Sequence, residues 1–347
     1  MPSITQEIQE NIHILKKLLP LLSIIPSILI LYSLHPESFQ IAYQGRTLYL
    51  FFLWLISLEI ILNWEETRKN QTSPNKPIER VSLIISLLLP TIYVIVANYY
   101  GLNVMIVKTA EQNKVPLAHL TPLATEYLVF ALLFASTILL THKKKRFMDY
   151  SIPTFFLLSI GVIFMIDDLY PYGWFTPFQI LVPATATLAA NILNLMGYQT
   201  HMSFETHPKY GFMPYLSVKN LGNQSEAVSF GIAWPCAGVE SLLIYTVTIL
   251  LFLKKTSIPW GHRIVYFVIG AIITYTINVL RVVAIFLISM TGGDVWAFHN
   301  YYGWLYSITW ILSYPLIVVG SRIFWRKIRN WEVVQDGSES VQDATFS

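Results

Sequence analysis

Three side chains in the C-terminal half of the chain have the chemistry needed for acyl transfer. Cys236, in the segment Trp-Pro-Cys-Ala-Gly-Val-Glu, carries a thiol that can act as a nucleophile. His299 carries an imidazole that can accept and donate a proton near neutral pH. Arg281 carries a fixed positive charge that can stabilise an oxyanion. If the fold brings these groups together, they can transfer an acyl group through a thioester.

Each of the three residues also has an ordinary structural interpretation. A lone cysteine in a membrane helix is usually a small apolar filler. A buried arginine usually pairs with an acid, and Glu240 is available for Arg281. A histidine in a loop is usually a surface or interface residue. The choice between these interpretations therefore depends on the elements that position the side chains.

The composition indicates that lipid solvates most of the chain. Of 347 residues, 54% are hydrophobic and 12% are charged, whereas about a quarter of a soluble protein is charged. A net charge of +3 gives no reason to expect a nucleic-acid partner, and a single cysteine excludes an internal disulfide. A collagen-like, disordered or disulfide-rich protein is excluded, and a polytopic α-helical membrane protein is expected.

Apolar stretches long enough to cross a bilayer recur along the whole chain. The first is followed by Leu-His-Pro rather than a cleavage site, so we expect a retained anchor and not a signal peptide. The stretches lie near residues 18–34, 47–62, 81–97, 127–141, 151–166, 175–196, 237–253, 264–290 and 302–320.

The positions of lysine and arginine predict the orientation of these spans. Most of the 23 basic residues fall into five clusters, which the positive-inside rule places in the cytoplasm. The clusters are Lys16 and Lys17; Arg68, Lys69, Lys76 and Arg80; Lys143, Lys144, Lys145 and Arg146; Lys254, Lys255 and Arg263; and Arg322, Arg326, Lys327 and Arg329. Both termini are then cytoplasmic, and segments 98–126 and 167–235 face outward.

An even number of crossings must separate the cytoplasmic clusters at 143–146 and 254–255, but three apolar stretches lie between them. Stretch 175–196 carries prolines, threonines and asparagines, so we predict that it is an outer re-entrant or interfacial segment. The expected fold is an all-α transmembrane bundle of about eight spans. We divide it into helices of unassigned role at 1–166, a catalytic core at 167–325 and a disordered cytoplasmic tail at 326–347.

This topology places the three reactive side chains at one depth. Cys236 begins a span at its outer end, and His299 lies in the outer loop before the last span. Arg281 is roughly 25 Å from the cytoplasmic start of its helix near Ile264, which is close to the outer boundary. Thr274, Asn278 and Arg281 share one face of that helix. Because lysines and arginines at other positions predict the orientation, the shared depth of these three side chains favours a catalytic site.

The local sequence suggests how the neighbours assist. Pro235 suits a first helical position, so we expect Cys236 in the first helical turn, where the helix dipole lowers the pKa of a thiol. Asp294 could orient His299, and Asn278 could bind the substrate backbone or hold Arg281. We expect no metal and no cofactor.

The set formed by Cys-Ala-Gly at 236–238, Asn278-x-x-Arg281 and His299 resembles the exosortase and archaeosortase family of integral-membrane cysteine transpeptidases. The resemblance covers roughly residues 175–320, and the earlier spans match only in being hydrophobic. It implies that Cys236 is the nucleophile, Arg281 the transition-state cation and His299 the acid or base.

The resemblance also implies the partners. Family members process secreted proteins whose C-terminal sorting signal contains a motif, a transmembrane helix and a basic tail. The acceptor of the acyl group is a lipid, a glycan or water, and the Cys-Ala-Gly form favours the archaeal, lipid-attaching branch. The alternative is a transporter or a non-enzymatic assembly factor that uses Arg281 and Glu240 as a polar site.

Overall fold

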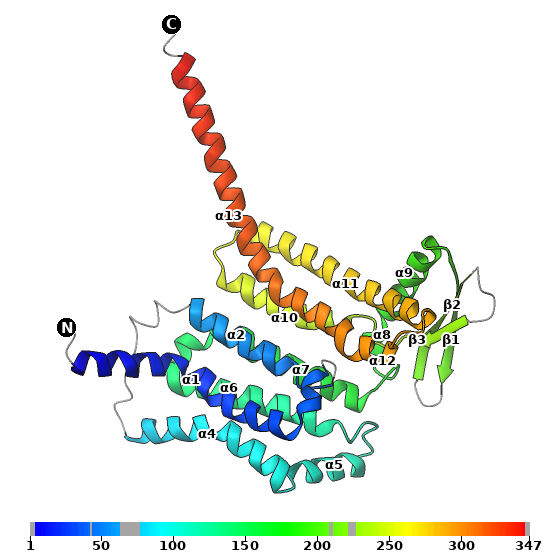
Figure 1. Cartoon of the computed structure of the whole chain (residues 1–347), viewed down its shortest axis with the longest axis horizontal. Coiled ribbons are helices and arrows are strands. Elements are labelled where there is room, and N and C mark those ends of the chain that lie inside the picture. The colour runs from blue at the N-terminus through cyan, green and yellow to red at the C-terminus, as the bar shows by residue number, and fades with distance from the viewer. Residues whose placement is uncertain (1–3, 42–43, 63–76, 208–210, 221–226, 344–347) are drawn as a thin grey trace.

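The protein is mostly helical, and its long helices run side by side in two groups. The computed structural model describes residues 4–41, 44–62, 77–207, 211–220 and 227–343. In Figure 1 the lower group contains α1 (Ile4–Leu34), α2 (Leu48–Leu62), α4 (Pro77–Tyr99), α5 (Leu102–Gln112), α6 (Thr121–Phe147) and α7 (Ser151–Leu169). The upper group contains α10 (Val239–Lys255), α11 (Trp260–Met290) and α13 (Gly303–Asp343).

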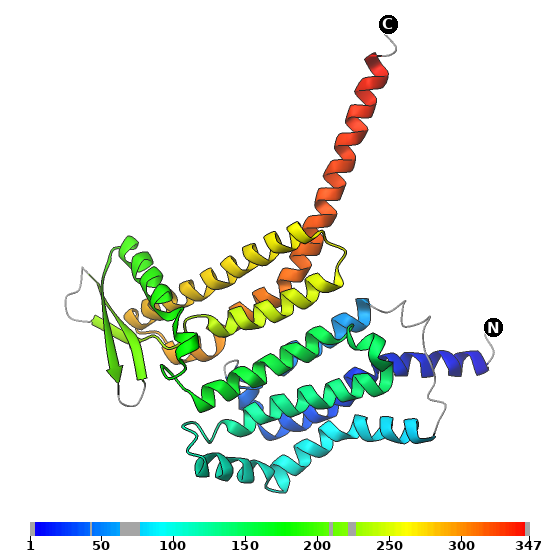
Figure 2. The same cartoon turned by 180° about the vertical axis from the view of Figure 1, so that it is seen from behind.

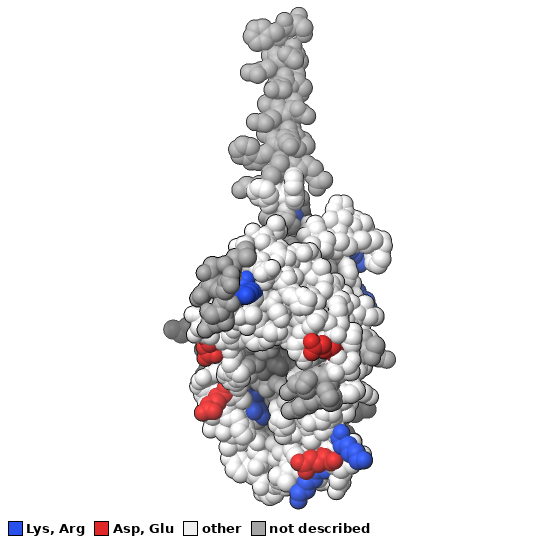
Figure 3. Space-filling view, turned by 90° about the vertical axis from the view of Figure 1, so that its right-hand side faces the viewer, with Lys and Arg blue, Asp and Glu red and all other residues white. Residues whose placement is uncertain are grey.

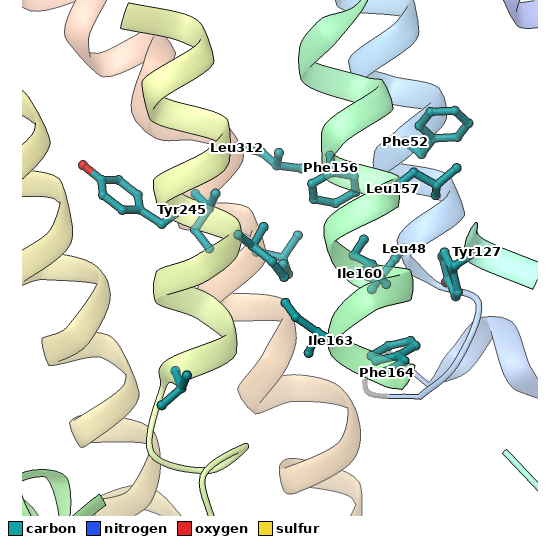
Figure 4. Packing of buried hydrophobic residues seen from close by; sticks show 14 of the residues in the cluster. Leu48, Phe52, Tyr127, Phe156, Leu157, Ile160, Ile163, Phe164, Tyr245 and Leu312 are labelled. Atoms are coloured by element: carbon teal, nitrogen blue, oxygen red, sulfur yellow. The ribbon is translucent and has the colours of Figure 1, made fainter. Parts of the chain in front are cut away.

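Helix α7 joins the two groups, because it packs against α6 and α2 on one side and against α10 on the other. Figure 4 shows Ile163 directed toward α10 and Leu157 toward α2. Gly161 lets α6 approach closely, since a Cβ at this position would lie 2.9 Å from the side chain of Leu128. This burial on several faces explains why the α7 sequence is apolar almost throughout.

Among the described residues, five helical segments are long and apolar enough to cross a membrane, and a sixth arises if α4 and α5, bent by 68°, form one span. The five are Thr121–Leu140, Ser151–Leu169, Pro177–Leu195, Trp260–Met290 and Leu305–Trp325. Two shorter apolar helices are Leu18–Leu34 and Leu48–Ile61. The chain is therefore a multi-pass membrane protein, and the count of eight crossings stays a prediction.

The segment expected to be re-entrant or interfacial forms two helices, α8 (Thr176–Gln179) and α9 (Val182–Leu195). Helix α9 lies obliquely at the far end of α11, beside the strands, in both Figure 1 and Figure 2. By length and composition alone, Pro177–Leu195 also qualifies as a span. Whether it crosses the membrane stays a prediction.

A small antiparallel sheet corrects the all-α prediction. Strands β1 (Tyr198–His207), β2 (Gly211–Asn220) and β3 (Ala227–Gly231) pair in the order β1-β2-β3. Leu216 and Val218 of β2 are fully buried and join the main core. Pro214 conceals this central strand in the sequence, because proline lacks the N–H that a ladder needs. Pro214 faces Ile232, which lies one residue beyond the end of β3 at Gly231. The structure tolerates the proline because its missing N–H falls at the end of the ladder with β3.

The charged helix ends gather away from this sheet. Lys254 and Lys255 end α10, Arg263 is near the start of α11, and residues 143–146 are near the end of α6; all lie at the opposite end of the molecule from the strands (Figure 1). This grouping is what the charge pattern predicts, although the side of the membrane stays a prediction. Arg68, Lys69 and Lys76 lie outside the described residues.

The C-terminal residues differ from the expected disordered tail, because α13 continues as one helix to Asp343. Extending an anchored helix costs less free energy than starting a new one, and the transmembrane part of α13 supplies that anchor.

A buried ion pair holds the N-terminal group together. Arg46, which the charge pattern places in an outer loop, donates two hydrogen bonds to Glu126, Nε to Oε1 at 2.8 Å and Nη2 to Oε2 at 2.7 Å. Tyr49 donates its hydroxyl to the same carboxylate at 3.1 Å. The pair ties the segment before α2 to α6.

We predict that Arg46→Ala destabilises the protein by about 3–5 kcal/mol, because it leaves the Glu126 carboxylate buried without its counter-ion. Replacing both residues, as in Arg46→Met with Glu126→Leu, should cost much less. Unfolding in micelles, followed by circular dichroism, measures both. Equal losses for the single and the double variant would contradict the role of the pair.

Candidate active site

Cys236 lies in a tight turn between strand β3 and helix α10. Its backbone N–H donates to the carbonyl of Ala233 at 3.0 Å. Trp234 is fully buried, and its indole N–H donates to the carbonyl of Tyr170 at 3.3 Å. The hydroxyl of Thr185, from α9, donates to the carbonyl of Ala237 at 3.1 Å. The turn is therefore attached to the segment before α8 and to α9.

Gly238 closes the turn and starts α10 in a conformation that other residues rarely adopt. Its φ is +87°, and a Cβ there would lie 2.7 Å from the Cβ of Asn278 on α11. Both facts require glycine at this position. The glycine of the Cys-Ala-Gly segment thus brings the cysteine turn into direct contact with α11.

Asn278 supports the turn and is not available to a substrate. It is fully buried. Its side-chain amide donates to the carbonyl of Thr274 at 2.8 Å, and its oxygen accepts from the hydroxyls of Ser241 at 3.3 Å and Ser307 at 3.4 Å. These contacts join α10, α11 and α13. They replace the expected contact with the substrate backbone or Arg281.

His299 approaches Cys236 from the other side. It lies in η2 (Phe298–Tyr302), which follows the short helix α12 (Val295–Ala297). Its Nε2 is 3.7 Å from the Sγ of Cys236, within hydrogen-bonding distance for sulfur. Asp294 does not orient the imidazole directly, because its carboxylate accepts from the N–H of Ala297 at 2.9 Å and caps α12.

Arg281 lies next to this pair and is held through His299. Its Nη2 donates to the backbone carbonyl of His299 at 2.9 Å, and its side chain crosses Gly303, where a Cβ would lie 2.6 Å from Nε. The residue is 6% exposed, and within the described residues its Nε and Nη1 have no hydrogen-bond partner. Two N–H-bearing groups of a buried cation therefore remain for a further acceptor.

The sequence leaves open whether Arg281 pairs with Glu240, and the ion pairs among the described residues do not include this one. In the described part of the chain the ion pairs are Arg46 with Glu126 and Lys255 with Glu59. Glu240 is buried at the start of α10. The alternative of a transporter-like site at these two residues stays untested.

Burial reverses the expected charge state of the thiol. Cys236 precedes α10 instead of occupying its first turn, and burial raises the pKa of its thiol, while the Arg281 charge opposes this. Burial and the same charge lower the pKa of His299 to about 4. At neutral pH both groups are therefore uncharged, which gives a thiol beside an imidazole that can accept its proton.

An apolar cavity of about 580 Å³ opens beside the pair. The strands supply Met213, Tyr215, Phe230 and Gly231; α11 supplies Val282, Ile285 and Phe286; α12 supplies Val295 and Trp296; and Tyr172, Ile232, Ala233, Cys236 and His299 complete the lining. The arrangement can hold an apolar ligand against the sulfur atom of Cys236.

The sequence reasoning missed the contribution of the sheet to this cavity. The sequence predicts an outer segment at 167–235 without strands, so it gives no reason to expect Phe230 and Gly231 in a cavity beside the cysteine. The one available signal was their nearness in the chain to Cys236, which does not predict a strand.

Comparison with known proteins identifies one family. The family model described as transmembrane exosortase matches residues 44–317, well beyond the range of about 175–320 that the motif residues indicated. No curated protein and no solved structure matches the chain. The match includes the N-terminal helices, which showed only hydrophobicity in the sequence.

We predict that Gly238→Ala displaces the cysteine turn. The expected loss of folding free energy combines about 1–2 kcal/mol for an alanine in the left-handed backbone conformation with about 1–3 kcal/mol for overpacking against Asn278. Gly197→Ala is the matched control, because Gly197 has a φ of +90° but nothing within 4 Å of its Cβ position. Thermal unfolding in detergent and the rate of Cys236 alkylation report both effects. Similar behaviour of the two variants would show that the Asn278 contact is unimportant.

We also predict that alkylation of Cys236 by iodoacetamide accelerates as pH rises through a thiol pKa above the ordinary value. Because the Arg281 charge favours the thiolate, Arg281→Gln should move this midpoint to still higher pH and slow the reaction severalfold at pH 8. Mass spectrometry of the single cysteine measures the rate. A midpoint below the ordinary value, or a faster reaction in the variant, would contradict this account.

Proposed function

Since this chain belongs to the transmembrane exosortase family, whose members are membrane protein-sorting transpeptidases, we propose that it cleaves C-terminal sorting signals by a cysteine mechanism at Cys236. The observation that carries the proposal is the distance of 3.7 Å between the Cys236 sulfur and His299 Nε2. Arg281 lies beside them, and within the described residues its Nε and Nη1 have no hydrogen-bond acceptor.

The first half-reaction forms an acyl-enzyme. The sulfur of Cys236 attacks the scissile carbonyl carbon while its proton passes to Nε2 of His299. The carbonyl oxygen becomes an oxyanion, which accepts hydrogen bonds from Nε or Nη1 of Arg281. When the C–N bond breaks, His299 donates the proton to the leaving amine, and a thioester remains on Cys236.

The second half-reaction transfers the acyl group. A nucleophile of the acceptor gives its proton to His299 and attacks the thioester through a second oxyanion, which Arg281 stabilises in the same way. The C–S bond breaks, and the thiolate recovers the proton from His299. Arg281 keeps its charge throughout.

The substrate follows from the family and from the position of the site. A signal with a motif, one transmembrane helix and a basic tail would place its motif near Cys236 and its tail near the basic helix ends at the other end of the molecule (Figure 1). We propose that this second end is cytoplasmic, as are both termini, and that the site is near the outer face. In this arrangement residues 167–325 form the catalytic core, and residues 1–166 hold the substrate helix or complete the bundle.

The acceptor is a lipid, a glycan or water. The family match does not separate archaeosortases from other exosortases, so lipid attachment is a hypothesis that rests on the Cys-Ala-Gly form and on a composition with Ile, Asn and Lys. Each acceptor leaves a different mass on the product, so the intact mass of the processed protein distinguishes the three acceptors.

We predict that Cys236→Ala abolishes cleavage of a co-expressed secreted protein carrying such a signal, because the nucleophile is absent. His299→Gln should lower the rate by about two to four orders of magnitude. Intact mass and C-terminal sequencing of the protein measure the outcome. Gly197→Ala, remote from the site, should leave processing unchanged. Normal processing in the Cys236→Ala variant would overturn the mechanism.

A further inference from the structure

We propose that the free edge of strand β3 binds the substrate as an added strand and directs its scissile bond to Cys236. This inference rests on the proposed function and deepens it, because it defines how the peptide is recognised. The occupant is the extended segment on the amino side of the scissile bond. Its backbone would pair with β3, and its apolar side chains would enter the cavity.

The hydrogen-bond register identifies the groups on this edge. The N–H of Ile232 donates to the carbonyl of Pro214 on β2 at 2.9 Å, so residue 232 faces a hydrogen-bonded partner. In an antiparallel ladder such pairs alternate, which assigns Phe230 and Val228 to the ladder with β2. The N–H and C=O groups of Ser229 and Gly231 therefore point away from β2.

Nothing in the described part of the chain occupies this edge. β3 pairs with β2 only, and the remaining backbone hydrogen bonds of the described residues include none from Ser229 or Gly231. Ala227 and Ser229 are exposed. Edge strands with unpaired groups are templates for an added strand.

The edge also leads directly into the cavity beside the reactive cysteine. Phe230, Gly231, Ile232 and Ala233 follow one another along the cavity lining, and Cys236 lies at the end of this run. In Figure 1 strand β3 is the strand nearest α12, and α12 supplies the facing wall of the cavity through Val295 and Trp296. Met213 and Tyr215 of β2 also line the cavity, so it extends from the sheet to α12 and offers space for an extended chain beside β3.

The lining predicts the character of the bound peptide. Phe230, Phe286 and Val282 make the cavity apolar, whereas the surface at the sheet end of the molecule carries both acidic and basic groups at scattered points in Figure 3. Gly231 leaves room on this face of the sheet for the side chains of Met213 and Tyr215, which a Cβ there would meet at 3.1 Å. Since alternate residues of a strand face the same side, every second residue before the scissile bond should be apolar.

The location selects the amino side of the scissile bond. In the proposed function, the segment after that bond enters the bilayer as the substrate's helix. The cavity lies between the sheet and the ends of the helices, so the segment before the bond is the one that can remain in it.

The test uses capped tetrapeptide chloromethyl ketones of alternating valine and alanine, from which the Cys236 sulfur displaces chloride to form a thioether. A series with one N-methyl group at each amide in turn is compared by the rate of Cys236 labelling in the full-length protein. We expect losses of about threefold to tenfold at every second amide, because a β-added strand donates at alternate residues. Equal rates across the series, or losses without this alternation, would overturn the proposal.

A protein variant tests the other partner of the same hydrogen bonds. Ser229→Pro removes an outward N–H without affecting the ladder to β2 and should slow peptide labelling by about threefold to tenfold. Ser229→Ala keeps the N–H and should label at the normal rate. Iodoacetamide, which needs no strand pairing, should react equally with all three proteins. Unchanged peptide labelling in an Ser229→Pro protein that reacts normally with iodoacetamide would contradict edge binding.

These outcomes are separable from those of the proposed function. If the N-methyl series shows no alternation but cleavage of the sorting signal still requires Cys236, only the edge-binding model is overturned. Sorting that continues in the Cys236→Ala variant would remove the cysteine mechanism, whatever the labelling series shows.

Discussion

The position of the reactive thiol depends on the contact between Gly238 and Asn278. The absence of a side chain at Gly238 lets the start of α10 touch α11, and Asn278 is held there by hydrogen bonds from α10 and α13. Arg281 follows Asn278 on the same helix by three residues, about one turn later. One helix therefore both supports the cysteine turn and carries the cation.

Burial then determines the charges within this frame. A thiolate and an imidazolium would both lose hydration in the site, so the uncharged pair is favoured at rest. Arg281 stays charged, and its Nε and Nη1 groups, which have no hydrogen-bond acceptor among the described residues, can donate to a negative oxygen that forms nearby. The same cation that favours a thiolate also keeps His299 uncharged, which preserves its ability to accept a proton.

The rest of the molecule holds the site between a rigid bundle and a small sheet. Helix α7 joins the N-terminal group to α10, and Lys255 at the far end of α10 pairs with Glu59 of α2 at 2.6 Å. At the other end, the chain passes from β3 into the cysteine turn within a few residues. The sheet forms one wall of the cavity and is continuous with the residue that performs the proposed chemistry.

Apolar length and charge position are local properties of the chain, so the sequence predicts the membrane-spanning character and the grouping of the basic helix ends. The shared depth of Cys236, Arg281 and His299 follows from the same pattern, and the structure brings the three side chains together. The sequence did not reveal the sheet, since short strands outside the membrane carry a weak pattern and Pro214 interrupts it. The tertiary structure was needed to show that Asn278 supports the turn, that Asp294 caps α12 and that burial raises the pKa of the thiol. These properties depend on distances between segments far apart in the chain and on the burial that follows, which residue spacing along one helix does not specify.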